Sequence, residues 1–415
     1  MVRSQARSLI QPHLERIFAT AVAAVDPEIL VRGARHVVPP ARHYDVIAAG
    51  KGAVGMLAGV SDLPVRRVVR AGPADAAHPL PDERSVQRGA RALAVAREAA
   101  ADDVLLVLIS GGASSLLAGP ADGITLADKR ATVRQLLAAG APIGELNAVR
   151  KHLSAIKGGL LAAATRARVC ALLISDVVGD DPAVIASGPT VADPSTFGDA
   201  LAVLERRGGA AAYPAGVSER LRRGAAGAVQ ETPKPGDAAF ERATTTVIGG
   251  LQNALSAASE AAVALGYRVV IVDAPVVGEA RDAARDVAAR VEAARREGTP
   301  LCVISGGETT VTVRGRGRGG RNQELALALA PHLRAVGGDV AAICAGTDGV
   351  DGPTDAAGAY VDATTLTRAA SAGLDDERYL GDNDSYAFFD RLGDLIRTGP
   401  TGTNVGDIQI VVGRW

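Results

Sequence analysis

The chain has 415 residues and a formal net charge of −1, and 47% of its residues are hydrophobic. A chain of this length exceeds a single core, so two or three globular domains are expected. The near-neutral charge gives no long-range attraction to nucleic acid or to an anionic membrane, and an aromatic content of 3% leaves no stacking platform for single strands. Nucleic acid and membranes are therefore excluded as expected partners.

The N-terminal run MVRSQARSLIQPHLERIF has charged and polar residues throughout. We therefore expect neither a signal peptide nor a membrane-spanning helix there, and we expect a cytoplasmic location. Cys170, Cys302 and Cys344 lie in short apolar runs. Their spacing does not match a zinc site, and an odd number argues against a disulfide framework. These cysteines are expected to be reduced and buried.

Short apolar runs alternate with alanine-rich helical stretches along the chain. The runs are rich in valine and isoleucine, which is typical of strands buried on both faces. Strands are expected at 45–49, 104–109, 169–174, 244–248, 267–272, 301–304 and 340–344, and helices at 85–100, 251–265 and 279–297. This βαβ rhythm predicts an α/β protein with doubly wound, mostly parallel sheets.

Two prolines and alternating charges interrupt this rhythm at 231–237. Such a segment is typical of a domain boundary. We therefore expect one domain over 1–235 and a second over 236–415.

Glycine-rich, small or acidic segments follow most of the expected strands, among them 50–53, 110–115, 175–181, 305–310 and 345–355. Ligands of open α/β sheets bind at the carboxyl ends of the strands, so this recurrence indicates a polar ligand between two sheets. The first of these turns fits the G-x-G-x-x-G dinucleotide pattern only weakly, because Asp75 lies beyond the expected end of the second strand.

Lys51 stands between two glycines at the expected start of a helix. Helix N-termini disfavour cations, so a lysine there indicates a bound anion, either a transferring phosphoryl group or an anionic substrate. The alternative interpretation is simple solvent exposure at the start of the helix.

The segment 145–159 is expected to form one helix with two faces. Apolar residues repeat at helical spacing, whereas Asn147, Arg150, Ser154 and Lys157 share a polar face. Arg150 and Lys157 would then lie two turns apart. A cationic face without a compensating acid indicates an anionic ligand, although a solvated surface is the ordinary alternative.

Aspartates follow two of the expected strands, namely Asp176, Asp180 and Asp181 after one and Asp348, Asp351 and Asp355 after the other. Hard oxygen ligands at a strand end suit Mg²⁺, which takes one or two carboxylates together with phosphate oxygens and water. A Walker A motif is absent from the sequence, so any nucleotide site is of another kind.

The segment 305–324 places Arg314, Arg316, Arg318 and Arg321 among glycines. Planar guanidinium groups bind phosphate or carboxylate in a bidentate manner, and the glycines would let the backbone approach a ligand closely. The alternative is a mobile, exposed hairpin loop.

The sequence resembles the type-2 glycerate kinases, whose C-terminal part carries the MOFRL domain. The matching motifs span nearly the whole chain and include AAGKGA (48–53), LISGGASSLL (108–117), LNAVRKHLSAIKGG (146–159), GGRNQELALALA (319–330) and TGPTGTNVGDI (398–408). The resemblance implies two unlike three-layer α/β/α domains that face across an active-site cleft. The first would be Rossmann-like with a mostly parallel sheet, and the second, MOFRL-containing domain would have a mixed sheet.

The resemblance also implies transfer of the γ-phosphate of ATP to the 2-hydroxyl of D-glycerate, giving 2-phospho-D-glycerate. Lys51 and Arg321 match the family's catalytic pair and would stabilise charge on the phosphoryl oxygens while Mg²⁺ bridges the phosphates. Asp176 is expected as the base or as a metal ligand, with Asp348 and Asp351 as further metal ligands. Arg150 and Lys157 are expected to hold the glycerate carboxylate.

Nucleotide-binding residues are expected in the glycine turns and at one asparagine: Ser110, Gly111, Gly112, Ser114, Ser115, Gly306, Gly307, Asn383, Thr401, Gly402, Thr403 and Asn404. Because these groups fall on both sides of the expected boundary, catalysis is expected to require closure of the domains.

Two other functions stay open at this point. One is an NAD(P)H-dependent hydroxypyruvate reductase that uses the turn at Gly50, and the other is a non-catalytic sensor of sugar acids or nucleotides. The sequence leaves open the preferred hydroxy acid, the division of roles among the aspartates, the preferred metal and the oligomeric state, for which a homodimer is compatible.

Overall fold

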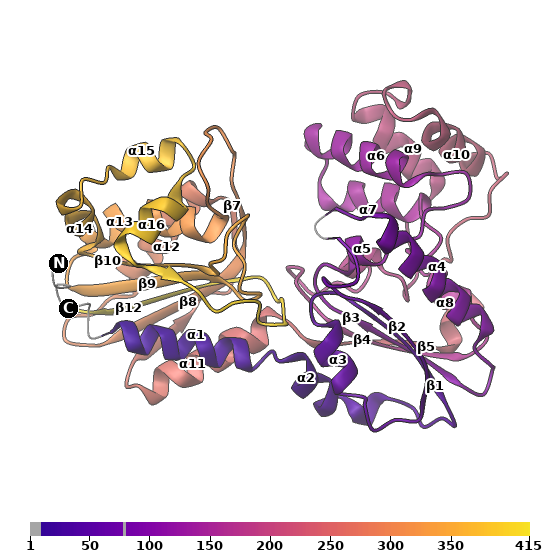
Figure 1. Ribbon diagram of the computed structural model, residues 1–415, viewed down its shortest axis with the longest axis horizontal. Coiled ribbons are helices and arrows are strands. Elements are labelled where there is room, and N and C mark those ends of the chain that lie inside the picture. Colours follow the sequence, from indigo (N-terminus) through magenta and orange to yellow (C-terminus); the bar gives the residue numbers. More distant parts are fainter. Residues whose placement is uncertain (1–9, 78–79) are drawn as a thin grey trace. The chain divides into compact units, whose positions relative to one another are not determined.

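The computed structural model describes residues 10–77 and 80–415, and the chain divides into two compact units (Figure 1). Pro27–Gly249 forms one unit, which we call the parallel-sheet domain. Gly250–Trp415 together with the segment ending at Asp26 forms the other, which we call the mixed-sheet domain. The expected organisation into two α/β domains is therefore confirmed.

The division between the domains differs from the expected boundary at 235/236. Strand β5 (Ala243–Gly249) pairs with β4 (Arg168–Ile174) and so belongs to the first sheet. Helix α1 (Gln11–Ala23) packs on α11 (Leu251–Ala264) and so belongs to the second domain. The proline-bearing segment at 231–237 predicted neither the place of β5 nor that of α1, because contacts between residues far apart in sequence decide to which domain an element belongs.

The described part of the parallel-sheet domain contains a five-stranded parallel sheet in the order β2-β1-β3-β4-β5. The remaining strands are β1 (Tyr44–Ala49), β2 (Val65–Ala71) and β3 (Val104–Ile109). Every residue of β1 and β3 is buried, as expected for strands covered on both faces. The apolar core of this sheet includes Ile47, Leu105 and Leu173.

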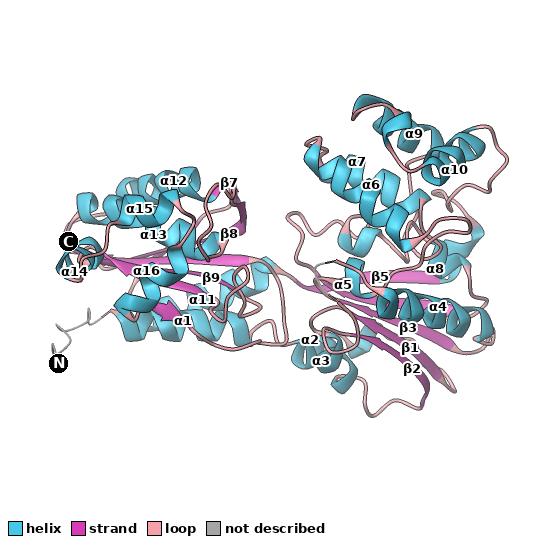
Figure 2. Ribbon diagram, turned by 45° about the horizontal axis from the view of Figure 1, so that its top comes forward, coloured by secondary structure: helices cyan, strands magenta, loops and turns pink. Residues whose placement is uncertain are grey.

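The helices of this domain are α2 (Pro27–Gly33), α3 (Ala53–Ala58), α4 (Glu83–Glu98), α5 (Ala113–Leu116), α6 (Leu126–Ala138), α7 (Ile143–His152), α8 (Leu160–Ala163), α9 (Phe197–Arg206) and α10 (Ala215–Ala225). Single 3-10 turns lie at Arg35–Val37, Ile185–Ser187, Ala210–Ala212 and Ala238–Arg242. Figure 2 shows α6, α7, α9 and α10 as a helical group beside the sheet, and these helices share an apolar core of their own.

The mixed-sheet domain contains, in its described part, a seven-stranded sheet in the order β11-β10-β9-β12-β8-β6, with β7 also paired to β8. Its strands are β6 (Arg268–Ile271), β7 (Val276–Glu279), β8 (Leu301–Thr310), β9 (Asp339–Gly346), β10 (Gly358–Asp362), β11 (Leu395–Ile396) and β12 (Asp407–Arg414). Strand β12 runs antiparallel to both of its neighbours, β8 and β9. The second sheet is therefore mixed, as expected.

Helices cover both faces of the mixed sheet. Figure 1 shows α1 and α11 on one face, with α12 (Ala280–Ala294) and α13 (Arg321–Val336) on the other. The outer helices are α14 (Thr365–Ser371), α15 (Asp376–Gly381) and α16 (Ser385–Leu392).

Every strand and every alanine-rich helix expected from the sequence is present, within one to a few residues at the ends, except that β8 is longer. Strands β7, β10, β11 and β12 were not expected, and β2 was expected only as a strand that ends before Asp75, without bounds. Strand β2 is an edge strand rich in arginine, and Arg66 and Arg67 both bind the buried carboxylate of Asp45 on β1. Charged residues of this kind hide a strand from an analysis based on apolar runs.

The three cysteines are free and buried, as expected. Part of the N-terminal segment, residues 1–9, lies outside the described residues. Across 10–77 and 80–415, no helix combines the length and the apolar character that crossing a membrane would require.

The helix expected at 145–159 is shorter than predicted, because α7 ends at His152. The hydroxyl oxygen of Ser154 accepts hydrogen bonds from the backbone N–H groups of Ile156 and Lys157, so the chain leaves the helix in a serine turn. Lys157 therefore does not share a helix face with Arg150.

Candidate functional site

The loops after β1 and β3 are locked together at the carboxyl end of the parallel sheet. The N–H of Gly52 donates to the hydroxyl of Ser110 at 2.9 Å, and the N–H of Lys51 donates to the carbonyl of Gly111 at 2.9 Å. Gly50 has a φ of +122°, and a Cβ there would lie 2.2 Å from the Ser110 hydroxyl oxygen. This packing fixes the backbone that carries Lys51.

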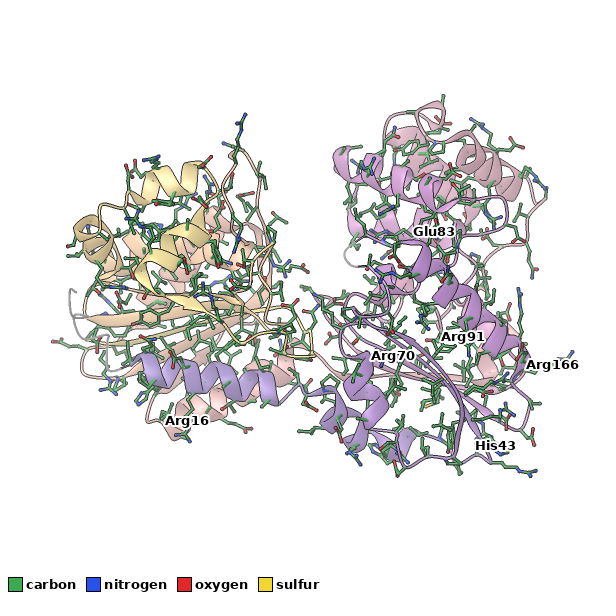
Figure 3. The ribbon with its side chains drawn as sticks, viewed as in Figure 1. Arg16, His43, Arg70, Glu83, Arg91 and Arg166 are labelled. Carbon is green, nitrogen blue, oxygen red and sulfur yellow. The ribbon has the colours of Figure 1, made fainter. Side chains whose placement is uncertain are left out.

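The turn after β1 does not form a dinucleotide-binding fingerprint. Asp75 binds Arg70 at 2.7 Å and accepts from the N–H of Gly72, so its carboxylate is already engaged. Figure 3 shows Arg70 and His43 at opposite ends of this sheet. Helix α3, which follows the turn, has only 6 residues. A Rossmann site needs an acid for the ribose and a helix N-terminus for the pyrophosphate.

Lys157 is buried and fully engaged by protein groups. Its ammonium donates to the Ser114 hydroxyl at 2.7 Å and to the Ala186 carbonyl at 3.0 Å, with a longer contact to the Ser114 carbonyl. Burial, together with the charges of Lys129 and Arg150, lowers the pKa of Lys157 well below its usual value. Because its ammonium is bound to protein groups, Lys157 has its charge, and not a free donor, to offer the expected carboxylate.

Beside Lys157, residues 186–188 have left-handed backbone, which is strained at Ala186 and Ser187. Ala186, Ser187 and Gly188 have φ values of +51°, +62° and +62°. A left-handed conformation at a residue other than glycine costs about 1–3 kcal/mol, and such strain concentrates at ligand sites. The Ser187 hydroxyl donates to the side-chain oxygen of Asn147 at 3.0 Å.

Arg321 is the first residue of α13 and is held by two carboxylates in the mixed-sheet domain. Its Nε and Nη2 donate to Asp407 at 2.5 and 3.0 Å, and Nη1 donates to Glu308 at 2.7 Å. Burial disfavours the charge, but the hydrogen bonds and charge of Asp407 outweigh it and raise the pKa of Arg321. The guanidinium is therefore charged and fixed in orientation.

The other arginines of the 305–324 segment lie in an exposed loop that packs on residues 382–385. A Cβ at Gly317 or Gly320 would lie 2.3 or 2.2 Å from atoms of the Asp384 or Asp351 side chain. The glycines thus permit close packing against the protein, not against a ligand as expected. Arg318 stacks over the ring of Tyr386, with its guanidinium carbon 3.8 Å from the ring centroid.

Asn383 organises this loop. Its side-chain oxygen accepts hydrogen bonds from the N–H groups of Arg314 and Gly315, and its nitrogen donates to the buried Glu324. Because protein groups occupy both ends of the amide, the expected nucleotide contact of Asn383 has no support in this geometry.

Asp351 is buried and caps α13. Its carboxylate accepts hydrogen bonds from the N–H groups of Asn322 and Gln323, at 3.1 and 2.9 Å. Burial raises the pKa of Asp351 to about 7, with the charge of Asp407 adding to the effect. A capped, proton-binding carboxylate fits the expected metal role poorly, whereas Asp348 and Asp176 are only partly buried.

Within the described residues, no group of three or more histidine, cysteine, aspartate or glutamate side chains is arranged to hold a metal ion. Mg²⁺ in nucleotide sites uses one or two carboxylates with phosphate oxygens and water. A single carboxylate such as that of Asp348 would match this requirement.

The expected turn at Gly306 and Gly307 is a continuous strand. Strand β8 extends to Thr310, and Gly307 pairs with Asp407 of β12 on one side and with Val276 of β7 on the other. Strand pairing therefore competes for the backbone groups expected to bind a nucleotide there. Gly111 and Gly112 lie in the loop after β3, where the Ser115 hydroxyl donates to the Gly112 carbonyl.

The turn at 399–404 is held from within the mixed-sheet domain. Thr401 donates to the Thr347 carbonyl at 2.6 Å, and Thr403 donates to the Val25 carbonyl at 2.7 Å. Gly402 has a φ of +77°, and Asn404 is partly buried. The hydroxyls of this turn thus have protein partners, and so do the N–H groups of Thr401 and Thr403, which donate to the Asp348 carbonyl and to the Thr401 hydroxyl.

Sequence reasoning missed three residues that face the expected site residues: Asp407, Glu308 and Lys129. The first two stand in the motifs GTNVGDI and GGETT, so their presence was visible but their pairing with Arg321 was not. Lys129 lies on α6, and its charge acts on Lys157. No local signal marks it.

Two family models match the chain. "Domain of unknown function (DUF4147)" covers residues 13–222, and "MOFRL family" covers residues 301–407. A crystal structure of glycerate kinase from Thermotoga maritima superposes with a TM-score of 0.83 at 35% identity, covering 97% of this chain and 99% of that one. This chain belongs to the glycerate 2-kinase family with a C-terminal MOFRL domain.

Two relatives of similar length support the same membership. A "Glycerate 2-kinase" from Pyrococcus horikoshii is 38% identical over 415 residues, which is 96% of this chain and 93% of that protein. A protein of Agrobacterium vitis, provisionally named a hydroxypyruvate reductase, is 43% identical over 421 residues with the same coverage. The family thus includes members whose names give different activities.

Proposed function

We propose that this protein transfers the γ-phosphate of ATP to the 2-hydroxyl of D-glycerate, giving 2-phospho-D-glycerate and ADP. The observation that carries the proposal is the similarity to glycerate 2-kinases along nearly the whole length of both domains. The presence of Lys51 and Arg321 at the matching motifs supports it.

Lys51 and Arg321 would stabilise the negative charge on the oxygens of the transferred phosphoryl group. Phosphoryl transfer needs positioning and charge stabilisation more than covalent help. The bidentate contact with Asp407 supports this role for Arg321, because it fixes the guanidinium before substrate arrives. The backbone lock between Gly52 and Ser110 does the same for the loop of Lys51.

Asp176 would accept the proton of the 2-hydroxyl as its oxygen bonds to phosphorus and the bond from phosphorus to ADP breaks. Its place after β4, at the carboxyl end of the parallel sheet, supports this assignment. Asp348 is the aspartate of the mixed-sheet domain that best fits a Mg²⁺ ligand. The metal, when bound with ATP, would neutralise phosphate charge.

The nucleotide phosphates would bind the backbone N–H groups of Gly111 and Gly112 in the loop after β3 and of Gly402 in the turn at 401–404. The N–H groups of Ser110, Thr401 and Thr403 already donate to protein oxygens. Both segments are held by hydrogen bonds within their own domain, so they are preorganised. The hydroxyls of Ser114 and Ser115 already have protein partners, which makes them weaker candidates.

The name of the Agrobacterium vitis relative favours a second candidate, an NAD(P)H-dependent hydroxypyruvate reductase. The engaged carboxylate of Asp75 and the short α3 argue against a nicotinamide site at Gly50. Titration of the protein with NADH, followed by fluorescence, tests this candidate. We expect no saturable binding.

The kinase proposal is tested by ADP release in a coupled assay with D-glycerate and L-glycerate, and by mass spectrometry and NMR of the product. We expect activity with D-glycerate, a 2-phosphate product, and loss of turnover in excess chelator. ADP release that does not depend on glycerate, or a 3-phosphate product, would contradict the proposal.

A further inference from the structure

Three buried or largely buried cations in the parallel-sheet domain lack a carboxylate partner. They are Lys129 on α6, Arg150 on α7 and Lys157 after α7. Within residues 10–77 and 80–415, none of them forms an ion pair, although their charges act on one another. Buried charges are costly unless paired, so this cluster is expected to bind an anion.

A fourth group in the same place also lacks a partner. The side-chain nitrogen of Asn147 is buried and makes no hydrogen bond, although its oxygen accepts from Ser187. Rotating the amide would leave the oxygen unpaired instead, so one buried polar atom lacks a partner in either orientation. Such a group in a folded protein calls for a water or a ligand.

Asn147 and Arg150 are neighbours, because residues three apart lie side by side on a helix. The left-handed segment 186–188 links them to Lys157, since Ser187 contacts Asn147 and Ala186 contacts Lys157. The uncompensated charges, the orphaned amide and the strained backbone therefore occur together.

We propose that Lys129 and Asn147 complete, with Arg150 and Lys157, a binding subsite for a small carboxylate. This inference rests on the proposed function in one respect, namely that the carboxylate is that of D-glycerate. Arg150 and Asn147 supply hydrogen bonds, because neither the guanidinium nor the amide nitrogen has a protein partner among the described residues. Lys129 and Lys157 supply charge.

Lys129 makes the subsite sensitive to pH. Burial, and the charges of Arg150 on α7 and Arg220 on α10, lower the pKa of Lys129 to about 7. Its ammonium keeps one hydrogen bond, to the carbonyl of Leu153 at 3.0 Å. A bound anion favours the charged lysine, so binding above pH 7 takes up a proton and weakens as the pH rises.

Isothermal titration calorimetry tests the subsite with D-glycerate, D-lactate and glycerol, each with and without a non-hydrolysable ATP analogue. Both acids should bind and glycerol, which has no carboxylate, should not. Lys129→Gln should raise the Kd of glycerate roughly 10- to 100-fold, the range expected for loss of one charge-assisted interaction. Asn147→Asp, which keeps the shape and adds negative charge, should weaken binding at least as much.

Arg134→Gln is the matched control, because it removes an exposed cation from the same helix and should leave the Kd unchanged. Thermal melts confirm that each variant is folded. If a variant does not fold, the test is the proton uptake that accompanies glycerate binding to the wild-type protein. It is measured by calorimetry at pH 7.5 in two buffers of different ionisation enthalpy. Absent uptake, or unchanged affinity in folded variants, would overturn the subsite.

The outcome separates the subsite from the kinase proposal. Carboxylate binding that depends on Lys129, in a protein without kinase activity, would leave the subsite standing and remove the function. Kinase activity with a glycerate KM that is the same in the wild type, Lys129→Gln and Asn147→Asp would support the kinase function and overturn the subsite. Failure of both acids to bind under every condition would also overturn the subsite.

Discussion

Arg321 in the mixed-sheet domain is a partly buried cation and Lys129 in the parallel-sheet domain is a buried one, and they differ in what faces them. Arg321 meets two carboxylates, and its pKa is raised. Lys129 meets a carbonyl and further cations, and its pKa is lowered. The fold thus gives Arg321 carboxylate partners within the protein, whereas Lys129 has none among the described residues and can gain one only from a bound anion.

This difference suits the two residues to different functions, namely transition-state stabilisation and binding of the substrate carboxylate. A guanidinium fixed by carboxylates keeps its charge and its direction, which suits a group that must face charge appearing in a transition state. Cations without acid partners gain most when an anion binds, which suits recognition of a ground-state carboxylate. Variants of a cation with carboxylate partners, such as Arg321, should therefore change kcat. Variants of a cation without them, such as Lys129, should change the KM for glycerate.

Replacing Arg321 is expected to have the largest effect. Arg321→Ala should lower kcat on the order of a hundredfold or more, with a smaller change in the KM for ATP, because the donor acts mainly in the transition state. Steady-state kinetics with both substrates varied measures it. Arg318→Ala, whose side chain stacks on Tyr386, is the neighbouring control and should stay near wild type.

Arg321→Ala also leaves Asp407 buried without a partner, so a melt must accompany the kinetics. The double variant Arg321→Ala/Asp407→Asn should recover stability and not kcat. Recovery of both would remove Arg321 from catalysis and make its role structural.

Lys51→Ala should also lower kcat by about a hundredfold, again with the smaller change in the KM for ATP. Its backbone is held by the contacts of Gly52 and Gly111, so the loop should keep its conformation. A kcat close to wild type would show that Lys51 acts on neither the phosphoryl group nor its charge.

Arg150→Met sharpens the comparison from the other side. Loss of a charge-assisted hydrogen bond to carboxylate is worth about 1.5–3 kcal/mol, so the KM for glycerate should rise roughly 10- to 100-fold. The KM for ATP should change little. A fall in kcat with an unchanged KM for glycerate would mean that Arg150, like Arg321, acts in the transition state. That result would contradict the proposed difference between the two groups of cations.

Asp407→Asn tests whether the orientation of Arg321 matters. It should lower kcat about tenfold, because one of the two hydrogen bonds to the guanidinium is lost, the other is no longer made to a charged oxygen, and the guanidinium loses its fixed direction. Glu308→Gln is the matched control, since the Glu308 side chain is 53% exposed while that of Asp407 is 2% exposed. Equal effects of the two variants would count against a positioning role for Asp407.

The smallest effect concerns stability and pH. Asp351 binds a proton more tightly in the folded state, with a pKa of about 7, than in the unfolded state. Between pH 4 and pH 7 the unfolded chain ionises first, so stability falls as the pH rises, by about 1.4 kcal/mol for each unit of pKa difference. Urea unfolding should show a smaller fall in Asp351→Asn than in the wild type.

The sequence by itself determined the fold class, the positions of most strands along the chain and the two catalytic candidates. Buried parallel strands such as β1 and β3 are continuous apolar runs, so their pattern is local. Lys51 and Arg321 stand in short motifs whose glycines and charges are adjacent in the chain. Patterns formed by residues adjacent in the chain can be recognised without knowing how the chain packs.

Only the tertiary structure decided what these residues face. Asp407 meets Arg321 because β12 lies beside β8 and its first residue pairs with Gly307. Lys129 acts on Lys157 because α6 packs on α7, and Lys157 left the expected helix because Ser154 turned the chain. Such contacts join residues far apart in sequence, so no local periodicity encodes them, and they set whether a cation is neutralised or left to bind an anion.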